Sequence, residues 1–262
     1  MMEFDENVFR HIGRPIPRKE DERLLRGLGR FTDDFNLPGQ YYAAFVRSPC
    51  PHARIGRIDV ESARKCSGVA GVFVGADCAR DGLGPIQHNP VPSTKHDLKL
   101  TGPGGAEVFI GPHVLLPTDK ARHVGEAVAM VVAETHAQAM DAAELVEVDF
   151  EELPHVTESW KAAEPGAPVI WEQVPDNVLV ETIFGDAAAT DAAFSAADHV
   201  VKARYHVGRV TAVPIEPRAA LADYDPETGR YVLYAGSGGA VRQKGELARL
   251  LGIEADRLRV IS

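Results

Sequence analysis

The sequence predicts a mixed α/β protein in two parts, and three observations lead to that prediction. An apolar run, a helix-like run and an alternating run follow one another between residues 124 and 153. A hairpin pattern, a glycine-rich turn and a second helix-like run occupy residues 219–252. Between these parts, residues 154–177 contain four prolines and little periodicity, which is typical of a linker.

Composition restricts the classes of protein to which this chain can belong. Its 262 residues are 45% hydrophobic and 25% charged, as in a globular protein with one large domain or two ordinary ones. The formal net charge of -10 argues against a nucleic-acid-binding surface, because neutralising phosphates needs clustered lysine and arginine. A polar N-terminal stretch and the lack of any run of ~20 apolar residues predict a cytoplasmic protein without a membrane span.

The three cysteines, Cys50, Cys66 and Cys78, lack the paired spacing of a metal-binding or redox motif. Because their number is odd and they lie far apart, we expect neither a disulfide framework nor a zinc or iron–sulfur site. Cys50 and His52 are close in sequence, but two ligands alone do not make a metal site. We therefore assign no metal ligands in this chain.

In the first part, aromatic and β-branched residues predict a strand over residues 40–48. Residues 59–68 predict a short helix closed by Gly68, followed by a strand over residues 71–76. Residues 81–105 are rich in glycine, proline, asparagine and histidine, which predicts a long surface loop. Loops of that length are uncommon in compact domains unless they cover a site or meet a partner.

The clearest unit of the first part begins with an apolar run over residues 124–134, continuous enough for a strand buried on both faces. Thr135 and Gln138 then have capping-box spacing, which predicts that a helix starts at Thr135. Residues 146–153 alternate as a second strand. A strand, a helix and a strand with short connections predict a right-handed βαβ crossover, whose two strands are parallel.

In the second part, Asp186 is placed to open a helix, and residues 198–210 alternate as a long strand. Two further alternating runs flank the Pro-Glu-Thr-Gly turn at residues 226–229, which is the best hairpin signal in the chain. The helix that follows ends at Gly252, a typical C-cap, and residues 253–262 begin another strand. A strand at this position suggests an incomplete domain.

The glycine-rich turn at residues 236–239 departs from the known phosphate-binding patterns. The third position of a dinucleotide-binding fingerprint falls on Val241, and a Walker loop needs Gly-Lys where this chain has Lys244 followed by Gly245. The turn also follows a hairpin strand, which predicts a mixed sheet. Two interpretations stay open, a tight turn with nothing bound or a backbone that approaches a ligand at a helix N-terminus.

Just before the hairpin, Glu216, Pro217 and Arg218 interrupt apolar sequence. Buried charges are costly unless they are paired. One interpretation is a structural ion pair between Glu216 and Arg218 that fixes the start of the strand, and the other is that both side chains line a ligand channel.

Taken together, five stretches follow the order seen in one family. They are "IGRPIPRKEDERLLRGLGRFTDDFNLPGQYYAAFVRSPCPHARI", "ARHVGEAVAMVVAE", "GDAAATDAAF…ADHVV", "EPRAALADYDPETGRYVLYAGSGG" and "LRVIS". From about Ile12 to the last residue, the chain resembles the molybdopterin-binding large subunit of the xanthine dehydrogenase, aldehyde oxidase and aerobic carbon monoxide dehydrogenase family.

The resemblance implies a mixed α+β and α/β fold, with an a/b hammerhead domain followed by the start of a molybdopterin-binding domain. In this chain it implies an N-terminal extension over residues 1–26 and a hammerhead domain over residues 27–153. A linker over residues 154–176 and the first, incomplete part of the molybdopterin-binding domain over residues 177–262 follow. The chain is then expected to be a fragment of a longer subunit.

The resemblance also implies an oxidoreductase of the molybdenum hydroxylase type that oxidises a small molecule. Its cofactor is molybdenum–molybdopterin in a dinucleotide form, and electrons pass to a 2Fe-2S small subunit and an FAD-binding medium subunit. In the family the catalytic glutamate lies further along the chain than Ser262, so no catalytic residue is expected among these residues. Substrate, electron acceptor and oligomeric state stay open.

Within that family the glycine-rich turn passes close to the molybdenum, where many members have glutamine followed by glycine. Here the matching pair is Gly238 and Gly239, so the amide side chain is missing, which argues against carbon monoxide as the substrate. The resemblance implies that the backbone N–H groups of Ser237, Gly238 and Gly239 approach the cofactor.

Glu126 matches a hammerhead strand motif and is expected to be structural. We expect a structural role for His52 and a surface or interdomain position for His123.

Two other functions remain open from the sequence. The alternative is that the chain is a stand-alone hammerhead-type module that binds a partner subunit without catalysis. A third interpretation, with less support, is a nucleotide-binding domain that uses the glycine-rich turn.

Overall fold

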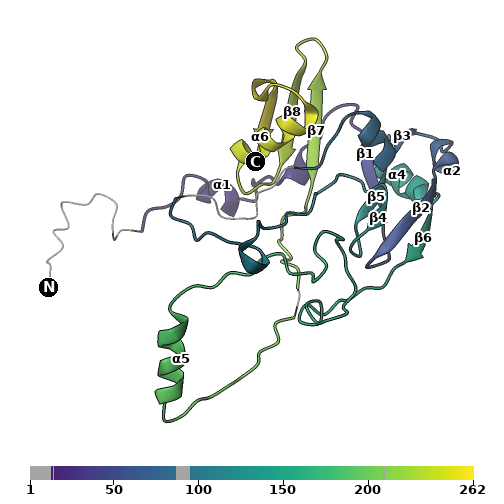
Figure 1. Ribbon diagram of the computed structural model, residues 1–262. Helices are drawn as coiled ribbons and strands as arrows, with labels where there is room; N and C mark the ends of the chain where they lie inside the picture. The colour runs from purple at the N-terminus through teal and green to yellow at the C-terminus, as the bar shows by residue number, and fades with distance from the viewer. Residues whose placement is uncertain (1–12, 14, 87–94, 209) are drawn as a thin grey trace.

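The computed structural model describes residue 13 and residues 15–86, 95–208 and 210–262. It contains two separate regions of sheet, as Figure 1 shows, and we call residues 40–153 the first part and residues 219–262 the second part. The expected loop over residues 81–105 has no strand or α-helix among its described residues, and residues 87–94 lie outside them. Within the described residues, no helix is long and apolar enough to cross a membrane.

Two three-stranded sheets make up the first part. Their orders are β1-β5-β3 and β4-β2-β6, and every pair in them is antiparallel. The helices are short and pack at the edges or on one face of the sheets. The strands are β1 (Tyr42–Arg47), β2 (Ala53–Asp59), β3 (Val69–Val74), β4 (Lys120–Ala121), β5 (Ala127–Ala133) and β6 (Glu147–Glu152), and the helices are α2 (Glu61–Arg64), α3 (Gly75–Arg80) and α4 (His136–Ala143).

The predicted βαβ crossover is wrong, because β5 and β6 belong to different sheets. The apolar run of β5 has another cause. Ala129 and Val131 face a core cluster that includes Ala142 of α4, whereas Val128 packs against Ile55 and Ala121 of the other sheet. A strand between a helix and a second sheet needs apolar side chains on both faces. Burial on both faces therefore does not require a parallel neighbour.

The predicted helix start at Thr135 is confirmed. The Thr135 hydroxyl oxygen accepts a hydrogen bond from the backbone N–H of Gln138 at 3.2 Å, and α4 begins at the next residue. The short helix α2 is present, but it ends at Arg64. Gly68 lies beyond it in a turn with a φ of +80°, and so it does not cap that helix.

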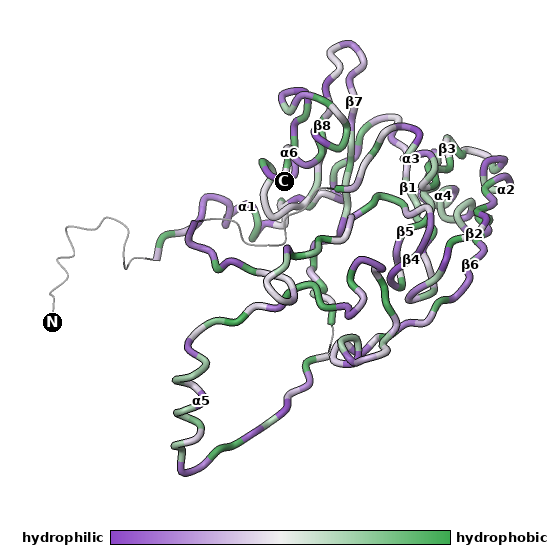
Figure 2. The backbone as a smooth tube through the Cα atoms, in the orientation of Figure 1, coloured by the Kyte–Doolittle hydropathy of each residue, from purple (hydrophilic) through white to green (hydrophobic). Residues whose placement is uncertain are grey.

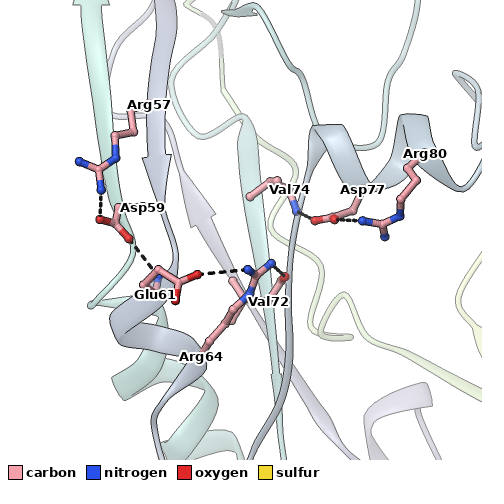
Figure 3. A network of polar contacts seen from close by, with 8 residues as sticks. All are labelled: Arg57, Asp59, Glu61, Arg64, Val72, Val74, Asp77 and Arg80. Atoms are coloured by element: carbon pink, nitrogen blue, oxygen red, sulfur yellow. Dashed lines mark hydrogen bonds and ion pairs between the residues drawn. The ribbon is translucent and has the colours of Figure 1, made fainter.

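The sequence reasoning missed helix α3. The expected strand over residues 71–76 ends at Val74, where the Asp77 carboxylate accepts a hydrogen bond from the Val74 N–H at 2.8 Å. Arg80 holds the other oxygen of Asp77 at 2.7 Å (Figure 3). A carboxylate three residues after an extended residue is a helix-start signal.

In the second part, β7 (Ala220–Asp225) pairs with β8 (Arg230–Ala235) in antiparallel fashion, and β8 pairs with β9 (Leu258–Ile261) in parallel. The hairpin and the mixed sheet are both confirmed. Helix α6 (Ala240–Leu251) connects β8 to β9, and its C-cap is Gly252 with a φ of 63°. The Asp225 carboxylate accepts hydrogen bonds from the Glu227 N–H at 2.9 Å and from the Thr228 hydroxyl at 2.5 Å, which closes the turn.

The described residues of the segment 198–210 do not form the predicted strand. They belong to no helix or strand, and the side chains of Val201, Tyr205 and Val207 are exposed. An alternating pattern favours extended backbone, but a strand also needs a hydrogen-bonding neighbour. The helix opened by Asp186 is confirmed as α5 (Ala187–Ala196), and it lies on the same excursion, away from both regions of sheet (Figure 1). Figure 2 shows the apolar stretches that flank it.

The proline-rich segment over residues 154–177 is not a free linker. Asn177 adopts a φ of 57°, and its side-chain amide donates hydrogen bonds to the carbonyls of Ala162 and Pro168, both at 2.9 Å. Val174 is buried. Trp171 packs against the Arg122 guanidinium, 4.1 Å from the ring centroid. Side-chain contacts therefore order this segment against the first part without helix or strand.

Candidate functional site

The glycine-rich turn connects the end of β8 to the start of α6. Gly239 precedes the first residue of the helix, and its N–H donates a hydrogen bond to the Ser237 hydroxyl at 3.3 Å. A Cβ atom built on Gly238 or Gly239 would meet nothing within 4 Å. The backbone at these two glycines therefore faces open space, and the first turn of α6 presents its unpaired N–H groups next to it.

Glu216 lies beside this turn. A Cβ atom on Gly236 would be 3.4 Å from Glu216 Oε1, so the missing side chain leaves room for the carboxylate. Glu216 is half-buried, and Arg218 is exposed. A cavity of about 410 Å³ adjoins them, and its wall consists of Pro214, Glu216, Pro217, Arg218, Ala219 and Gly236. The turn and the Glu-Pro-Arg stretch therefore meet at one site.

The structural interpretation of Glu216 and Arg218 as an ion pair is wrong. Within the part of the chain that the structure describes, neither side chain forms an ion pair or a hydrogen bond. Both line the cavity, which is the arrangement of the second interpretation. In a regular strand, residues i and i+2 point to the same face, but residues 215 and 216 lie in a bend, so the spacing of Glu216 and Arg218 does not bring their side chains together.

The segment that contains Arg30 and Phe35 approaches the same sheet. The Phe35 ring stacks on the Tyr234 ring with centroids 5.1 Å apart, and the Arg30 guanidinium lies 4.3 Å from the centroid of Phe35. Tyr234 is in β8, two residues before Gly236. These contacts hold a segment from before the first sheet against the strand that leads into the glycine-rich turn. Among the described residues before β1, Asp21–Leu25 forms helix α1 and Thr32–Asp34 forms a 3-10 turn.

Three other residues singled out from the sequence have structural contacts. The Glu126 carboxylate accepts a hydrogen bond from the backbone N–H of Arg122 at 2.6 Å, so it closes the turn before β5. The buried His52 ring places Nδ1 3.0 Å from the carbonyl of Pro154. His123 is exposed, with Nδ1 3.1 Å from the carbonyl of Val124. The structural interpretation of Glu126 and His52 and the surface position of His123 agree with these contacts.

The three cysteines Cys50, Cys66 and Cys78 are free thiols. Burial raises the pKa of the buried Cys50 thiol, and the nearby Glu152 carboxylate, whose Oε1 lies 3.8 Å from Sγ, raises that pKa further. Burial likewise raises the pKa of Cys78, and Asp77 adds to the effect. Among the described residues, no group of three or more histidine, cysteine, aspartate or glutamate side chains is arranged to hold a metal ion.

The sequence reasoning missed a second cavity, of about 670 Å³, in the first part. Trp171 from the proline-rich segment and Arg122 from the turn before β5 both line it. No short-range pattern connects these two residues, because they lie far apart in the sequence. The only available signal was the tryptophan itself, a large aromatic residue in a segment interpreted as a linker.

Comparison with known proteins identifies the two parts. A model of the aldehyde oxidase and xanthine dehydrogenase a/b hammerhead domain matches residues 26–154. A model of the molybdopterin cofactor-binding domain matches residues 170–262.

Individual relatives agree with these models. The nicotine 6-hydroxylase large subunit of Paenarthrobacter nicotinovorans is 40% identical over 253 residues, which are 96% of this chain and 29% of that protein. The carbon monoxide dehydrogenase large chain of Afipia carboxidovorans is 33% identical over 229 residues, 83% of this chain and 26% of that one. The crystal structure of quinoline 2-oxidoreductase from Pseudomonas putida 86 matches with a TM-score of 0.79 at 33% identity, over 94% of this chain and 29% of that chain.

The chain thus spans under a third of the length of these relatives. It matches them through both parts and in the same order, and the solved structure reproduces its mixed fold. The chain belongs to the aldehyde oxidase and xanthine dehydrogenase family of molybdopterin-binding large subunits, of which it carries hammerhead and cofactor-binding domain sequence.

Proposed function

We propose that this chain forms part of the wall around the molybdenum–pterin centre of a molybdenum hydroxylase large subunit, an oxidoreductase acting on a small molecule. The observation that carries the proposal is the open glycine-rich turn at the start of α6, inside the segment that matches the molybdopterin cofactor-binding domain. The stand-alone module has less support, because the relatives named above are large subunits or large chains of enzymes.

The residues at the turn fit a negatively charged group. The N–H groups of Ser237 and Gly238 have no partner among the described residues, and Gly239 keeps its N–H on the Ser237 hydroxyl. The positive end of the α6 dipole lies next to them. When bound, the molybdenum–pterin group supplies the redox chemistry. The chain itself contributes backbone donors that bind, and glycines that allow close approach.

Glu216 and Arg218 extend this site into the adjoining cavity. Because they are not paired with each other, each is free to contact a bound molecule, Glu216 as a hydrogen-bond acceptor and Arg218 as a donor. Pro214, Pro217 and Ala219 form apolar parts of the same cavity wall. These residues are proposed to orient a ligand rather than to carry the reaction.

The finer assignments belong to the same proposal. We assign the hammerhead domain to residues 27–153, the connecting segment to residues 154–176 and the beginning of the cofactor-binding domain to residues 177–262. We propose a dinucleotide form of the cofactor, a 2Fe-2S small subunit and an FAD-binding medium subunit as partners, and a cytoplasmic location. Two observations favour a small nitrogen heteroaromatic substrate over carbon monoxide. Position 238 is a glycine, and two of the relatives are named for nicotine and quinoline.

Metal analysis of the protein purified from its natural source tests the proposal, and we expect molybdenum and pterin to co-purify with it. Gly238→Leu fills the open space at the turn and is expected to remove most of the molybdenum. Gly245→Leu is the matched control, because its Cβ also meets nothing within 4 Å but lies further along α6. Wild-type protein without molybdenum, or full loading of Gly238→Leu, would overturn the proposal.

A further inference from the structure

The cavity of about 670 Å³ in the first part shares no lining residue with the cavity beside the glycine-rich turn. Its size is within the range of small-molecule sites. Most of its wall is apolar, formed by Leu83, Val114, Leu115, Pro117, Ile170 and Trp171. Asp119 and Glu126, both in contact with Arg122, form a polar end, and Thr118, His113 and His123 also line the cavity. An apolar wall with a few convergent polar groups is typical of a binding site.

The aromatic wall of this cavity is held in place before any ligand arrives. The Trp171 ring lies against the Arg122 guanidinium at 4.1 Å and against the Phe109 ring with centroids 5.7 Å apart. The neighbouring Glu172 carboxylate forms an ion pair with Lys120. These contacts fix the proline-rich segment on the first part, so the cavity does not have to be formed at the expense of binding energy.

The polar end carries an excess of negative charge. The Arg122 guanidinium donates to Asp119 Oδ2 at 3.1 Å and to the Lys120 carbonyl at 3.3 Å, so Asp119 balances its charge. Arg122 Nε is shielded from solvent and has no hydrogen-bond partner among the described residues. Glu126 accepts one backbone N–H and has no cationic partner within the described ranges of the chain. Its carboxylate is therefore the uncompensated charge of the cavity.

We propose that this cavity binds a small, flat organic cation, with its ring against the apolar wall and its charge facing the Glu126 carboxylate. A ring-shaped ligand buries its apolar faces against the leucine, proline and tryptophan side chains. A positive charge supplies the counter-ion that Glu126 lacks, in a setting where solvent screens the attraction less than at the surface. The site is separate from the glycine-rich turn, and it stands whether or not the chain binds molybdopterin.

Two probes with the same ring system, one of them larger by a single methyl group, separate charge from shape. At pH 8 N-methylquinolinium is a permanent cation and quinoline is neutral, and equilibrium dialysis against the purified chain measures both dissociation constants. We expect the cation to bind about tenfold more tightly, as one partly buried charge pair provides. Raising the salt concentration is expected to weaken binding of the cation more than binding of quinoline. Equal binding of the two probes would overturn the proposal.

Three variants locate the site. Glu126→Gln keeps an acceptor for the Arg122 N–H but removes the charge, and it is expected to abolish the preference for the cation. Ala79→Phe, on α3, fills the cavity and is expected to weaken both probes at least about tenfold. Ala76→Phe, exposed on the same helix but outside the cavity wall, is expected to bind like the wild type.

The variants also distinguish a failed fold from a failed proposal. If Glu126→Gln unfolds, two measurements still test the proposal. They are probe binding to Ala79→Phe, whose substitution is at an exposed position, and the salt dependence of cation binding to the wild type. Unchanged cation binding in Ala79→Phe would place the cation elsewhere and contradict the proposed site.

Discussion

The Glu216 carboxylate lies against the backbone of Gly236, so that a Cβ atom at position 236 would stand 3.4 Å from Oε1. This contact connects the Glu-Pro-Arg stretch to the glycine-rich turn across the hairpin that separates them. At 3.4 Å a single methyl group is in ordinary contact with the carboxylate, whereas a branched side chain has to displace it.

We therefore expect Gly236→Ala to change the free energy of unfolding by less than about 0.5 kcal/mol, and Gly236→Val to lower it by about 1 kcal/mol. Adding Glu216→Ala to Gly236→Val removes the atom that is crowded, so the double variant should recover part of the loss. Urea denaturation of the wild type, Gly236→Val, Glu216→Ala and the double variant measures the coupling between the two positions. Strict additivity would show that the two side chains do not meet.

The cap of α4 is expected to contribute measurably to stability. Thr135→Ala removes the hydroxyl that accepts the Gln138 N–H and should lower the free energy of unfolding by about 1 kcal/mol. Thr157→Ala, at an exposed threonine without a hydrogen bond in the described structure, is the control and should cost less than about 0.5 kcal/mol. Similar losses in the two variants would argue against the cap.

Asp77 is expected to make stability depend on pH. The Val74 N–H lowers its pKa most and Arg80 lowers it further, against the opposing effect of burial (Figure 3). Because the pKa in the folded protein is below the unfolded value, the stabilisation is present above the unfolded pKa of ~3.9 and is lost as pH falls through the folded pKa.

Asp77→Asn should therefore be less stable than the wild type at pH 7, and the difference should shrink as the pH is lowered below about 4. Asp141→Asn, at an exposed position of α4, is the comparison. Thermal unfolding measured from pH 3 to pH 7 tests this expectation. A stability difference that stays constant over that range would contradict it.

Hydrogen exchange should divide the chain sharply. The amides of β5 lie between two strands and above a helix, and they are expected to exchange slowly. The described residues of 198–215 pair with no strand, and their amides are expected to exchange at nearly unprotected rates. We also expect residues 177–262 as a whole to be less protected than residues 39–150. Mass spectrometry of peptides measures this on the monomer, and strong protection of residues 198–208 would refute the unpaired state.

Several features of the fold were predictable because their causes are local. Thr135 opens α4, Asp186 opens α5 and Gly252 ends α6, each through groups within a few residues. The turn over residues 226–229 follows from the same kind of local chemistry. Strand partners were not predictable in this way. The apolar pattern of β5 fits a central antiparallel strand as well as a parallel one, because both are covered on two faces.

The candidate site was only partly predictable. Its position at Ser237, Gly238 and Gly239 rests on the resemblance to the family and stays a prediction. The sequence left a ligand channel at Glu216 and Arg218 as one of two interpretations, and only the structure showed the cavity there. The expected pair of Glu216 and Arg218 failed because side-chain direction depends on the backbone around them. No sequence pattern pointed to Trp171 as a wall of the larger cavity, since its partners Phe109 and Arg122 belong to distant segments.

By itself, the amino-acid order determined where helices start and stop, where the hairpin turns and which family the chain resembles, because those properties depend on neighbouring residues or on motifs in series. Tertiary structure alone decided which strands pair, that Glu216 meets Gly236 and that Glu126 has no counter-ion among the described residues. The physical reason is that pairing and charge compensation depend on distances in space, and chain contacts between remote segments set those distances only once the protein is folded.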